Sequence, residues 1–308
     1  MDIRQVVLWG HKLHSHTHSY IHNAYVIAFK HLGYKTLWLD NNDDISGIDF
    51  TGTFFITEGQ VHQNMPVRND CYYVLHNCDM KRYCDLPERQ YMCLQVYTHD
   101  VVNKHFATPI DVSELSYYKE KDNCLWIPWA TDLLPHQIDE NIAKLKGGEF
   151  KNHNVVSFVG SFVGPAARPW ALVKRYCDNN NIRFFKPSNL SVEDNIRFTQ
   201  ASIVVPAVQS EWQCTNGYIP CRIFKNISYG KMGMTNNSAV YKLYNRDIIY
   251  DENIDQLMRK GLQFESLPFE ERVNRLVPLM ELTRDKHTYL NRIQSLFDFF
   301  IKIKKING

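Results

Sequence analysis

The first forty residues contain a strand–helix–strand pattern that restricts the fold more than any other part of the sequence. Residues 6–9 form a short apolar run that a glycine ends, and residues 36–39 form a second one. Between them, apolar side chains recur at the i, i+3, i+4, i+7 spacing of an amphipathic helix over residues 21–32, with Ser19 as expected N-cap and Gly33 just after the helix. A strand, helix and strand with short connections form a βαβ unit, which requires a parallel sheet.

The same alternation continues along most of the chain, with an interruption near residues 139–154, where a polar stretch contains two consecutive glycines, and the last forty residues or so are expected to be helical. The sequence therefore predicts the α/β class, with two Rossmann-like domains facing a central cleft. The expected domains cover residues 1–145 and 150–285, and a C-terminal helix over 286–308 could pack back on the first domain. The expected later strands are 53–56, 71–75, 93–97, 124–128, 155–159, 183–185, 202–205 and 232–235, and the expected later helices are about 168–178, 191 onward, 220–229, 269–281 and 288–305.

The composition narrows the class of protein. The chain has 308 residues, a formal net charge of +2 and 44% hydrophobic residues, enough to bury one or two full cores. So small a net charge gives no long-range field for nucleic acids, and no apolar run approaches the roughly 18 residues that span a bilayer. The eight cysteines contain no C-x-x-C pair. We therefore expect a cytoplasmic protein with reduced thiols, no nucleic-acid partner and at most peripheral membrane contact; the oligomeric state stays open.

Open parallel sheets bind ligands at the carboxyl ends of their strands, so the chemistry is expected there. In the second half, an Asn216–Gly217 turn precedes a helix whose N–H groups favour a phosphate. Arg222 and Lys225 lie three residues apart on that helix and can face the same side. The alternative is that both belong to an ordinary solvated helix face. Gly160 and Ser161 follow a strand directly and could bring their N–H groups to the same ligand.

Two aromatic residues lie just before the expected phosphate helix. Trp212 and Tyr218 could stack on a base or a sugar, because aromatic faces bind both well. The alternative, which has equal weight, is that they cover the edge of the core.

Several segments of the second half resemble the donor-binding half of GT-B glycosyltransferases, and most closely the group-1 family that includes CgeB-like proteins. They are FVGSF…R at residues 158–168, the strand ASIVVPA, and GYIPCRIFKNISYGKMGMTNN. PWATDLLP resembles the end of the first domain in that family, and DKHTYLNRIQSLF its C-terminal helix.

The resemblance implies transfer of a sugar from a UDP- or GDP-linked donor to a hydroxyl of a glycan, glycoprotein or glycolipid, with no metal and no other cofactor. Arg222 takes the place of the family's arginine, which implies contact with the donor phosphate, and Arg168 closes the first motif. In that family a glutamate follows an aromatic residue of the donor helix, and Lys225 occupies this position here. A second glutamate that such enzymes often have corresponds to Gly217. These two departures leave the donor and the stereochemistry open.

An inverting enzyme of this kind needs a general base near the acceptor. Histidines and carboxylates on the edge loops of the first domain are the candidates, and for each one alone an ordinary loop or packing role is the alternative. They are His11, His14, His16, Glu58, His76 and Asp79.

Two other functions compete with sugar transfer. The LHSHTHS segment resembles the first metal motif of PHP-type phosphoesterases, in which two histidines at i and i+2 bind one metal. That family needs further ligands around a barrel, and the second half of the chain supplies few, with His287 the only histidine after His153. The missing glutamates also allow a non-catalytic module that binds sugar nucleotides.

Overall fold

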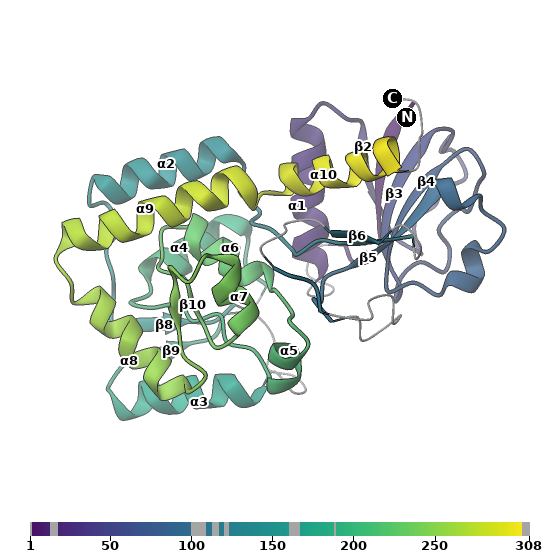
Figure 1. Ribbon diagram of the computed structural model, residues 1–308. Helices are drawn as coiled ribbons and strands as arrows, with labels where there is room; N and C mark the ends of the chain where they lie inside the picture. The colour runs from purple at the N-terminus through teal and green to yellow at the C-terminus, as the bar shows by residue number, and fades with distance from the viewer. Residues whose placement is uncertain are drawn as a thin grey trace. The chain divides into compact units, whose positions relative to one another are not determined.

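The computed structural model describes residues 2–12, 18–99, 109–112, 117–119, 123–159, 167–187 and 189–303 (Figure 1). The chain forms two compact units. Unit 1 comprises residues 1–110, 114–132 and 289–308, and unit 2 comprises 111–113 and 133–288.

The chain thus passes from unit 1 into the main part of unit 2 after residue 132, not near 145 as the two glycines suggested. The reason is helix α2 (Pro135–Lys146), which packs against α9 (Phe269–Lys286) within unit 2.

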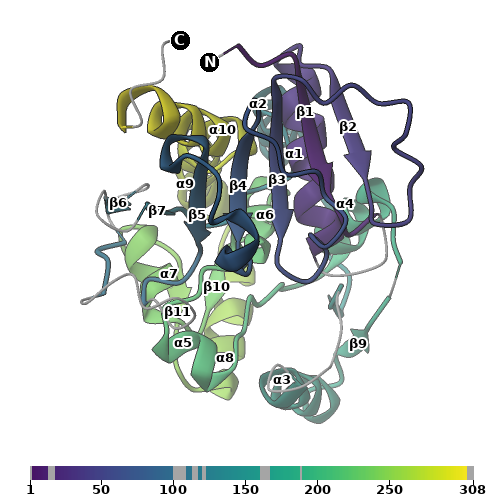
Figure 2. The same ribbon diagram turned by 90° about the vertical axis from the view of Figure 1, so that its right-hand side faces the viewer.

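Unit 1 is built on one seven-stranded sheet in the order β2-β1-β3-β4-β5-β7-β6 (Figure 2). Neighbouring strands pair in parallel except β6 and β7, which are antiparallel. β1, β3, β4 and β5 are buried along nearly their whole length, as expected of strands covered on both faces. The strands are β1 (Gln5–Trp9), β2 (Thr36–Leu39), β3 (Thr53–Glu58), β4 (Tyr72–His76), β5 (Tyr91–Gln95), β6 (Tyr117–Lys119) and β7 (Cys124–Trp126).

The two faces of this sheet have separate cores, because successive side chains of a strand point to opposite faces. Phe54 packs against Phe29 of α1 (His18–His31) and Phe297 of α10 (Tyr289–Asp298), with ring centroids 6.2 and 5.4 Å apart. Its neighbour Phe55 stacks on Tyr73 at 5.2 Å, in a cluster on the opposite face. The 3-10 helices Met80–Tyr83 and Glu88–Gln90 lie in the loops between β4 and β5.

The end of the chain returns to unit 1 through α10, which contacts α1. Arg292 of α10 is buried and donates from Nε to the carbonyl of Pro128 at 2.8 Å and from Nη2 to that of Trp129 at 2.9 Å. A π-helical turn, Phe299–Ile303, follows α10. Helix α1 begins at His18, so Ser19 is not its N-cap; the Ser19 hydroxyl donates to the carbonyl of Lys12 instead.

Unit 2 contains two short parallel pairs, β8 (Val155–Ser157) with β9 (Arg183–Phe185), and β10 (Met234–Thr235) with β11 (Ile249–Tyr250). The expected strand at 202–205 does not form a ladder: only Ser202 and Ala207 make isolated bridges there. The backbone N–H of Ser157 donates to the side-chain hydroxyl of Ser202, which replaces a backbone acceptor and interrupts the pairing.

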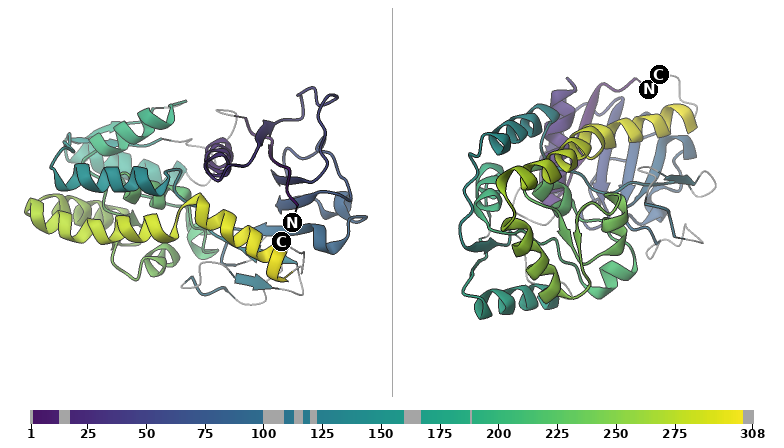
Figure 3. Two further views of the ribbon diagram at one scale, coloured as in Figure 1. Left: turned by 90° about the horizontal axis from the view of Figure 1, so that it is seen from above. Right: turned by 60° about the vertical axis from the view of Figure 1, so that its left-hand side comes forward.

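Helices make up most of unit 2, and α2 and α9 lie side by side on it (Figure 3). Asn141 of α2 donates to the carbonyl of Ser228, and Arg284 of α9 pairs with Asp139 at 2.6 Å. The capping-box prediction at Ser191 is correct in part, because its hydroxyl accepts the N–H of Asp194. The other helices are α3 (Ala167–Asn179), α4 (Val192–Ala201), α5 (Glu211–Thr215), α6 (Cys221–Ser228), α7 (Ser238–Leu243) and α8 (Ile254–Glu265).

Among the described residues, no helix combines the length and the apolar character that crossing a membrane requires.

Candidate functional site

A buried histidine–carboxylate pair lies at the carboxyl ends of two neighbouring strands of unit 1. Glu58 is the last residue of β3, and His11 follows the end of β1 by two residues. Nε2 of His11 lies 2.9 Å from Oε2 of Glu58, and both side chains are about 5% exposed. Because β1 and β3 are adjacent and parallel, residues 47 positions apart in the chain meet at one sheet edge.

A sharp turn of the backbone directs His11 to this edge. Gly10 has φ +90°, and a Cβ there would lie 2.0 Å from Cγ2 of Val61, so only glycine fits. His11 itself has φ +52°, in the left-handed region that is uncommon for residues other than glycine. Strain of this kind persists only where the surroundings hold it, and it is frequent at functional sites.

Two donors hold the turn in place by binding the carbonyl of Gly10. Nδ1 of His22 donates to it at 2.8 Å, and Nε1 of Trp38 at 2.9 Å. The carbonyl can only accept, so the proton of a neutral His22 is on Nδ1. Burial lowers the pKa of His22 to about 4, against the opposing effects of this hydrogen bond and of Glu58. His22 is therefore neutral at pH 7.

Glu58 is ionised in this environment. Burial alone would raise its pKa, but hydrogen bonds from His11 and from the backbone N–H of Gln60, 3.0 Å away, together with the field of nearby imidazoles, lower it to about 2. A fixed carboxylate in hydrogen-bond contact with an imidazole is the arrangement that orients a histidine and supports its action as a base.

Further aromatic and imidazole rings surround the pair. His76, the last residue of β4, donates from Nδ1 to the carbonyl of Leu94 at 3.1 Å, and burial lowers its pKa. The His18 ring stacks on His11 with centroids 5.4 Å apart and lies 5.7 Å from His76. Trp129 contacts both His18 and His76, at 5.9 and 5.2 Å.

The structure brings together three of the predicted base candidates: His11, Glu58 and His76. His14 and His16 lie outside the described residues. Asp79 is an exposed residue whose carboxylate accepts the N–H of Lys81 as N-cap of the helix Met80–Tyr83, so capping accounts for it. The prediction of Asp79 as a base is not supported by this geometry.

His18 and His22 belong to the cluster although neither was chosen as a candidate base. Both lie on the first turns of α1, whose amino end adjoins the strand ends. Their spacing of four residues places both side chains on one face of a helix, and this spacing could have indicated from the sequence that they lie together.

In unit 2, Arg222 is held at the carboxyl end of β8. Its Nη2 donates to the carbonyl of Val159 at 3.0 Å, and its guanidinium lies over the rings of Phe158 and Trp170 at 4.5 and 5.3 Å. Burial lowers the pKa of Arg222, yet an arginine keeps its charge at any ordinary pH. A positive charge is thus fixed beside the carbonyl of Val159. The predicted Gly160 and Ser161 lie outside the described residues.

Lys225 does not lie on a solvated helix face, which was the alternative to a binding role. Its side chain is only 8% exposed, and Nζ lies 5.9 Å from the ring of Tyr229. Arg222 is half-buried on the same helix, α6, which begins after Pro220 without a side-chain cap. Both cations therefore sit on the packed side of α6.

The remaining predicted donor residues lie before α6. Trp212 on α5 is 52% exposed, so it does not cover the core edge, while Asn216 is the C-cap of α5 and donates to the carbonyl of Trp212. Gly217 has φ +64°, and Tyr218 is half-buried. Arg168 is exposed on the first turn of α3.

A buried amide network fixes the segment before α6 and was not anticipated. Gln209 and Asn237 both donate to the carbonyl of Tyr218, at 2.8 and 2.9 Å. Asn237 Nδ2 also donates to Gln209 Oε1 at 2.8 Å. Asn236 exchanges hydrogen bonds with the backbone of Gln209. The available signal was the Asn–Asn pair that directly follows the strand ending at Thr235.

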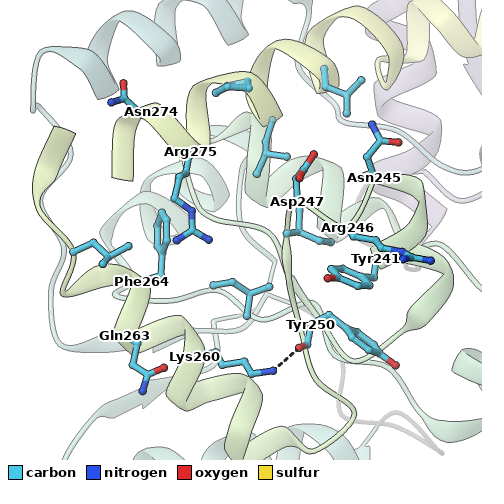
Figure 4. A pocket seen from close by; sticks show the side chains of 16 residues that line it. Tyr241, Asn245, Arg246, Asp247, Tyr250, Lys260, Gln263, Phe264, Asn274 and Arg275 are labelled. Carbon is cyan, nitrogen blue, oxygen red and sulfur yellow. Dashed lines mark hydrogen bonds between the residues drawn. The ribbon is translucent and has the colours of Figure 1, made fainter. Parts of the chain in front are cut away.

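A hollow of about 890 Å³ opens beside β11, between α7, α8 and α9 (Figure 4). Tyr241 and Tyr250 stack there at 4.8 Å, and Lys260 donates to the carbonyl of Tyr250 while pairing with Asp251. No residue predicted for the donor lines it.

Comparison with known proteins supports the fold. No family model and no curated protein matches the sequence. An alpha-glucosyltransferase in complex with UDP matches with a TM-score of 0.60 and 8% identity, over 97% of this chain and 100% of that chain. A glycosyltransferase from Rickettsia africae ESF-5 matches with 0.55 and 11%, over 100% of both chains. The DNA-modifying enzyme beta-glucosyltransferase, whose substrate is uridine diphosphoglucose, matches with 0.50 and 9%, over 98% and 100%.

Likeness at 8–11% identity establishes a fold and nothing finer. The prediction of an α/β protein with two Rossmann-like units of the GT-B type is confirmed at that level. The resemblance to the narrower CgeB-like family stays a prediction. The chain has the GT-B fold of these glycosyltransferases.

Proposed function

We propose that this protein is a glycosyltransferase that takes a sugar from a UDP-linked donor. The observation that carries the proposal is the match over essentially the full length of both chains to an alpha-glucosyltransferase solved with UDP. A second neighbour uses uridine diphosphoglucose, which makes UDP-glucose the first donor to test and favours UDP over GDP. For the acceptor we keep the hydroxyl of a glycan, glycoprotein or glycolipid.

Unit 2 would bind the donor through Arg222 and the uncapped amino end of α6. When the bond from the sugar to the nucleoside diphosphate breaks, its electron pair stays on the phosphate oxygen, where negative charge develops. The guanidinium of Arg222 and the first-turn N–H groups of α6, which begins without a side-chain cap, can stabilise that charge without a metal. Lys225 adds a second positive charge on the same helix, buried at 8% exposure.

Unit 1 would supply the general base. With the Nε2–H of His11 donated to the carboxylate of Glu58, the basic nitrogen of His11 is Nδ1. It takes the proton of the acceptor hydroxyl while the acceptor oxygen bonds to the anomeric carbon and the nucleoside diphosphate leaves. The carboxylate of Glu58 stabilises the positively charged imidazolium that forms when His11 takes this proton. A single displacement of this type inverts the anomeric centre.

The two competing functions fit the structure less well. A PHP-type phosphoesterase requires ligands around a barrel, whereas the described strands of unit 1 form an open sheet with β2 and β6 at its edges. A module that only binds sugar nucleotides gives no reason for a buried, strained histidine paired with a carboxylate at the strand ends.

Calorimetric titration of the full-length protein with UDP, GDP and CDP tests the donor assignment. We expect UDP to bind most tightly, and Arg222→Ala to weaken UDP binding by at least about tenfold, because a hydrogen bond to a charged group contributes roughly 1.5–3 kcal/mol. Arg259→Ala, an exposed arginine on α8, is the matched control. Equal affinity of wild type and Arg222→Ala for UDP would remove Arg222 from the site.

A further inference from the structure

The strand-end cluster of unit 1 has a second property besides the proposed base. One ligand atom each from His11, His18 and Glu58 all lie within 4.8 Å of one another. Two of these side chains are buried and His18 is half-buried. Three protein atoms of metal-binding type thus converge on one point at the carboxyl edge of the sheet, on three separate elements.

The spacing of the His11 and Glu58 atoms fits two ligands of one metal ion. Bonds from zinc to histidine nitrogen and to carboxylate oxygen are about 2.0–2.2 Å long, so two ligands at 90–109° around one ion lie roughly 2.9–3.5 Å apart. Nε2 of His11 and Oε2 of Glu58 are 2.9 Å apart already. The ion would replace the proton that these two atoms share, with little movement of either side chain.

Outer contacts hold two of the three ligands in position, as they do in established metal sites. The backbone N–H of Gln60 donates to Oε2 of Glu58 at 3.0 Å. The turn that presents His11 is fixed by the hydrogen bonds of His22 and Trp38 to the carbonyl of Gly10. The third ligand, His18, lies on the first turn of α1, where its ring stacks on that of His11.

The donor set selects the class of metal. Two imidazoles and one carboxylate suit zinc and other first-row transition metals, whereas magnesium and calcium prefer oxygen ligands throughout. The described residues supply three protein ligands, fewer than the four of a structural zinc site. We propose that His11, His18 and Glu58 bind one divalent transition-metal ion, with zinc as the expected occupant.

The metal and the proposed base exclude one another, and this consequence rests on the proposed function. A metal on Nε2 of His11 and on the carboxylate of Glu58 removes the hydrogen bond that makes the pair basic. With the metal on Nε2, the proton of the neutral ring is on Nδ1, which then has no lone pair to accept the proton of the acceptor hydroxyl. Zinc at saturating concentration should therefore inhibit sugar transfer, and a chelator should restore it.

Cobalt(II) titration of metal-stripped, full-length protein tests the site without any substrate, because cobalt(II) bound to nitrogen and oxygen ligands absorbs visible light. We expect one cobalt per chain, displaced by zinc. His18→Ala should weaken binding by more than about tenfold, since even outer-shell partners contribute roughly 10–100-fold. His136→Ala, an exposed histidine of unit 2, should bind cobalt as the wild type does. Equal affinities for wild type and His18→Ala, or no cobalt spectrum in the wild type, would overturn the proposal.

Circular dichroism of each variant shows whether it is folded, and Glu58→Gln provides a second ligand substitution if His18→Ala is not. The metal and the proposed function fail separately in this design. Cobalt binding without any UDP binding would support the metal site and contradict sugar transfer. Sugar transfer from a UDP-linked donor without cobalt binding would support the proposed function and contradict the metal site. Transfer that is stimulated by zinc, instead of inhibited, would contradict the mutual exclusion of metal and base.

Discussion

Nε2 of His11 and Oε2 of Glu58 lie 2.9 Å apart in the interior of unit 1, although 47 residues separate them in the chain. Each residue stands at the carboxyl end of a strand, and the two strands are neighbours in the sheet. The pair joins a buried carboxylate to a buried imidazole. The catalytic proposal depends on this contact.

Replacing Glu58 with glutamine should slow sugar transfer by about 10²–10⁴-fold, the usual contribution of a general base and the group that supports it. The affinity for UDP should be unchanged, because the donor residues belong to unit 2. Asp85→Asn, the same chemical change at an exposed carboxylate of unit 1, is the control and should transfer at the wild-type rate. Steady-state kinetics and UDP titration of both variants measure these effects; a Glu58→Gln enzyme with wild-type kcat would contradict the role of the pair.

Arg222→Lys should bind UDP more weakly than the wild type but more tightly than Arg222→Ala. Lysine keeps the charge, but it loses the planar fork that binds Val159 and lies over Phe158 and Trp170. The order of the three affinities, measured by calorimetry, separates a charge effect from a geometric one. Identical UDP affinity of the lysine and alanine variants would show that the charge of residue 222 contributes nothing.

Three glycines of unit 1 should differ in their tolerance of alanine. Gly10→Ala combines φ +90° with a Cβ only 2.0 Å from Val61, so we expect a loss of several kcal/mol in the free energy of unfolding. Gly33 has φ +82° but open space around it, and its substitution should remove about 1–2 kcal/mol. Gly47 has neither constraint, and alanine there should change stability by less than about 1 kcal/mol.

Urea unfolding of the three variants measures this order. A Gly10→Ala protein as stable as Gly47→Ala would show that the turn presenting His11 does not require glycine.

Lys231 should make the stability of the protein depend on pH above neutrality. Lys231 is 3% exposed, and burial lowers its pKa to about 8, despite the opposing effect of Glu265. The unfolded lysine titrates near 10.4, so between about pH 8 and 10.4 the unfolded chain holds more protons than the folded one. Stability should therefore rise with pH through this window, by an amount on the order of 3 kcal/mol.

Comparing the wild type with Lys231→Met at pH 7.5, 9 and 10.5 isolates this effect, because all other groups titrate in both proteins. As the pH rises, the free energy of unfolding of the wild type should increase relative to that of Lys231→Met. Lys242→Met, at an exposed position, should keep a constant difference from the wild type. Parallel curves for Lys231→Met and the wild type would show that Lys231 does not change its pKa on folding.

The regular elements with a clear hydrophobic period could be predicted from the sequence. β2 and β9 have the expected bounds, and β1 and α1 were located within a few residues of their ends. Helix α2 was missed although Ile138, Ile142 and Leu145 follow the helical spacing and are buried. The Gly147–Gly148 pair after it was interpreted as a domain boundary, whereas it ends a helix that belongs to unit 2.

The candidate site was predictable only as a set of strand-end residues. The sequence places Glu58 and His76 at the ends of buried strands, but which strands are neighbours depends on the order of the sheet, which no local pattern encodes. The same holds for Arg222, whose acceptor, the carbonyl of Val159, is 63 residues away. The buried state of Lys225 likewise follows from packing around α6 and not from the spacing of its charges.

The most direct test of the account is the release of UDP from UDP-glucose by the wild-type protein and by Glu58→Gln, in the presence of a mixture of glycan acceptors. We predict that the wild type releases UDP and forms a glucosylated product of inverted configuration. Glu58→Gln should bind UDP equally well and release it at least about 100-fold more slowly. Wild-type protein that neither binds UDP nor turns over any UDP-sugar, or a Glu58→Gln protein as fast as the wild type, would contradict the account.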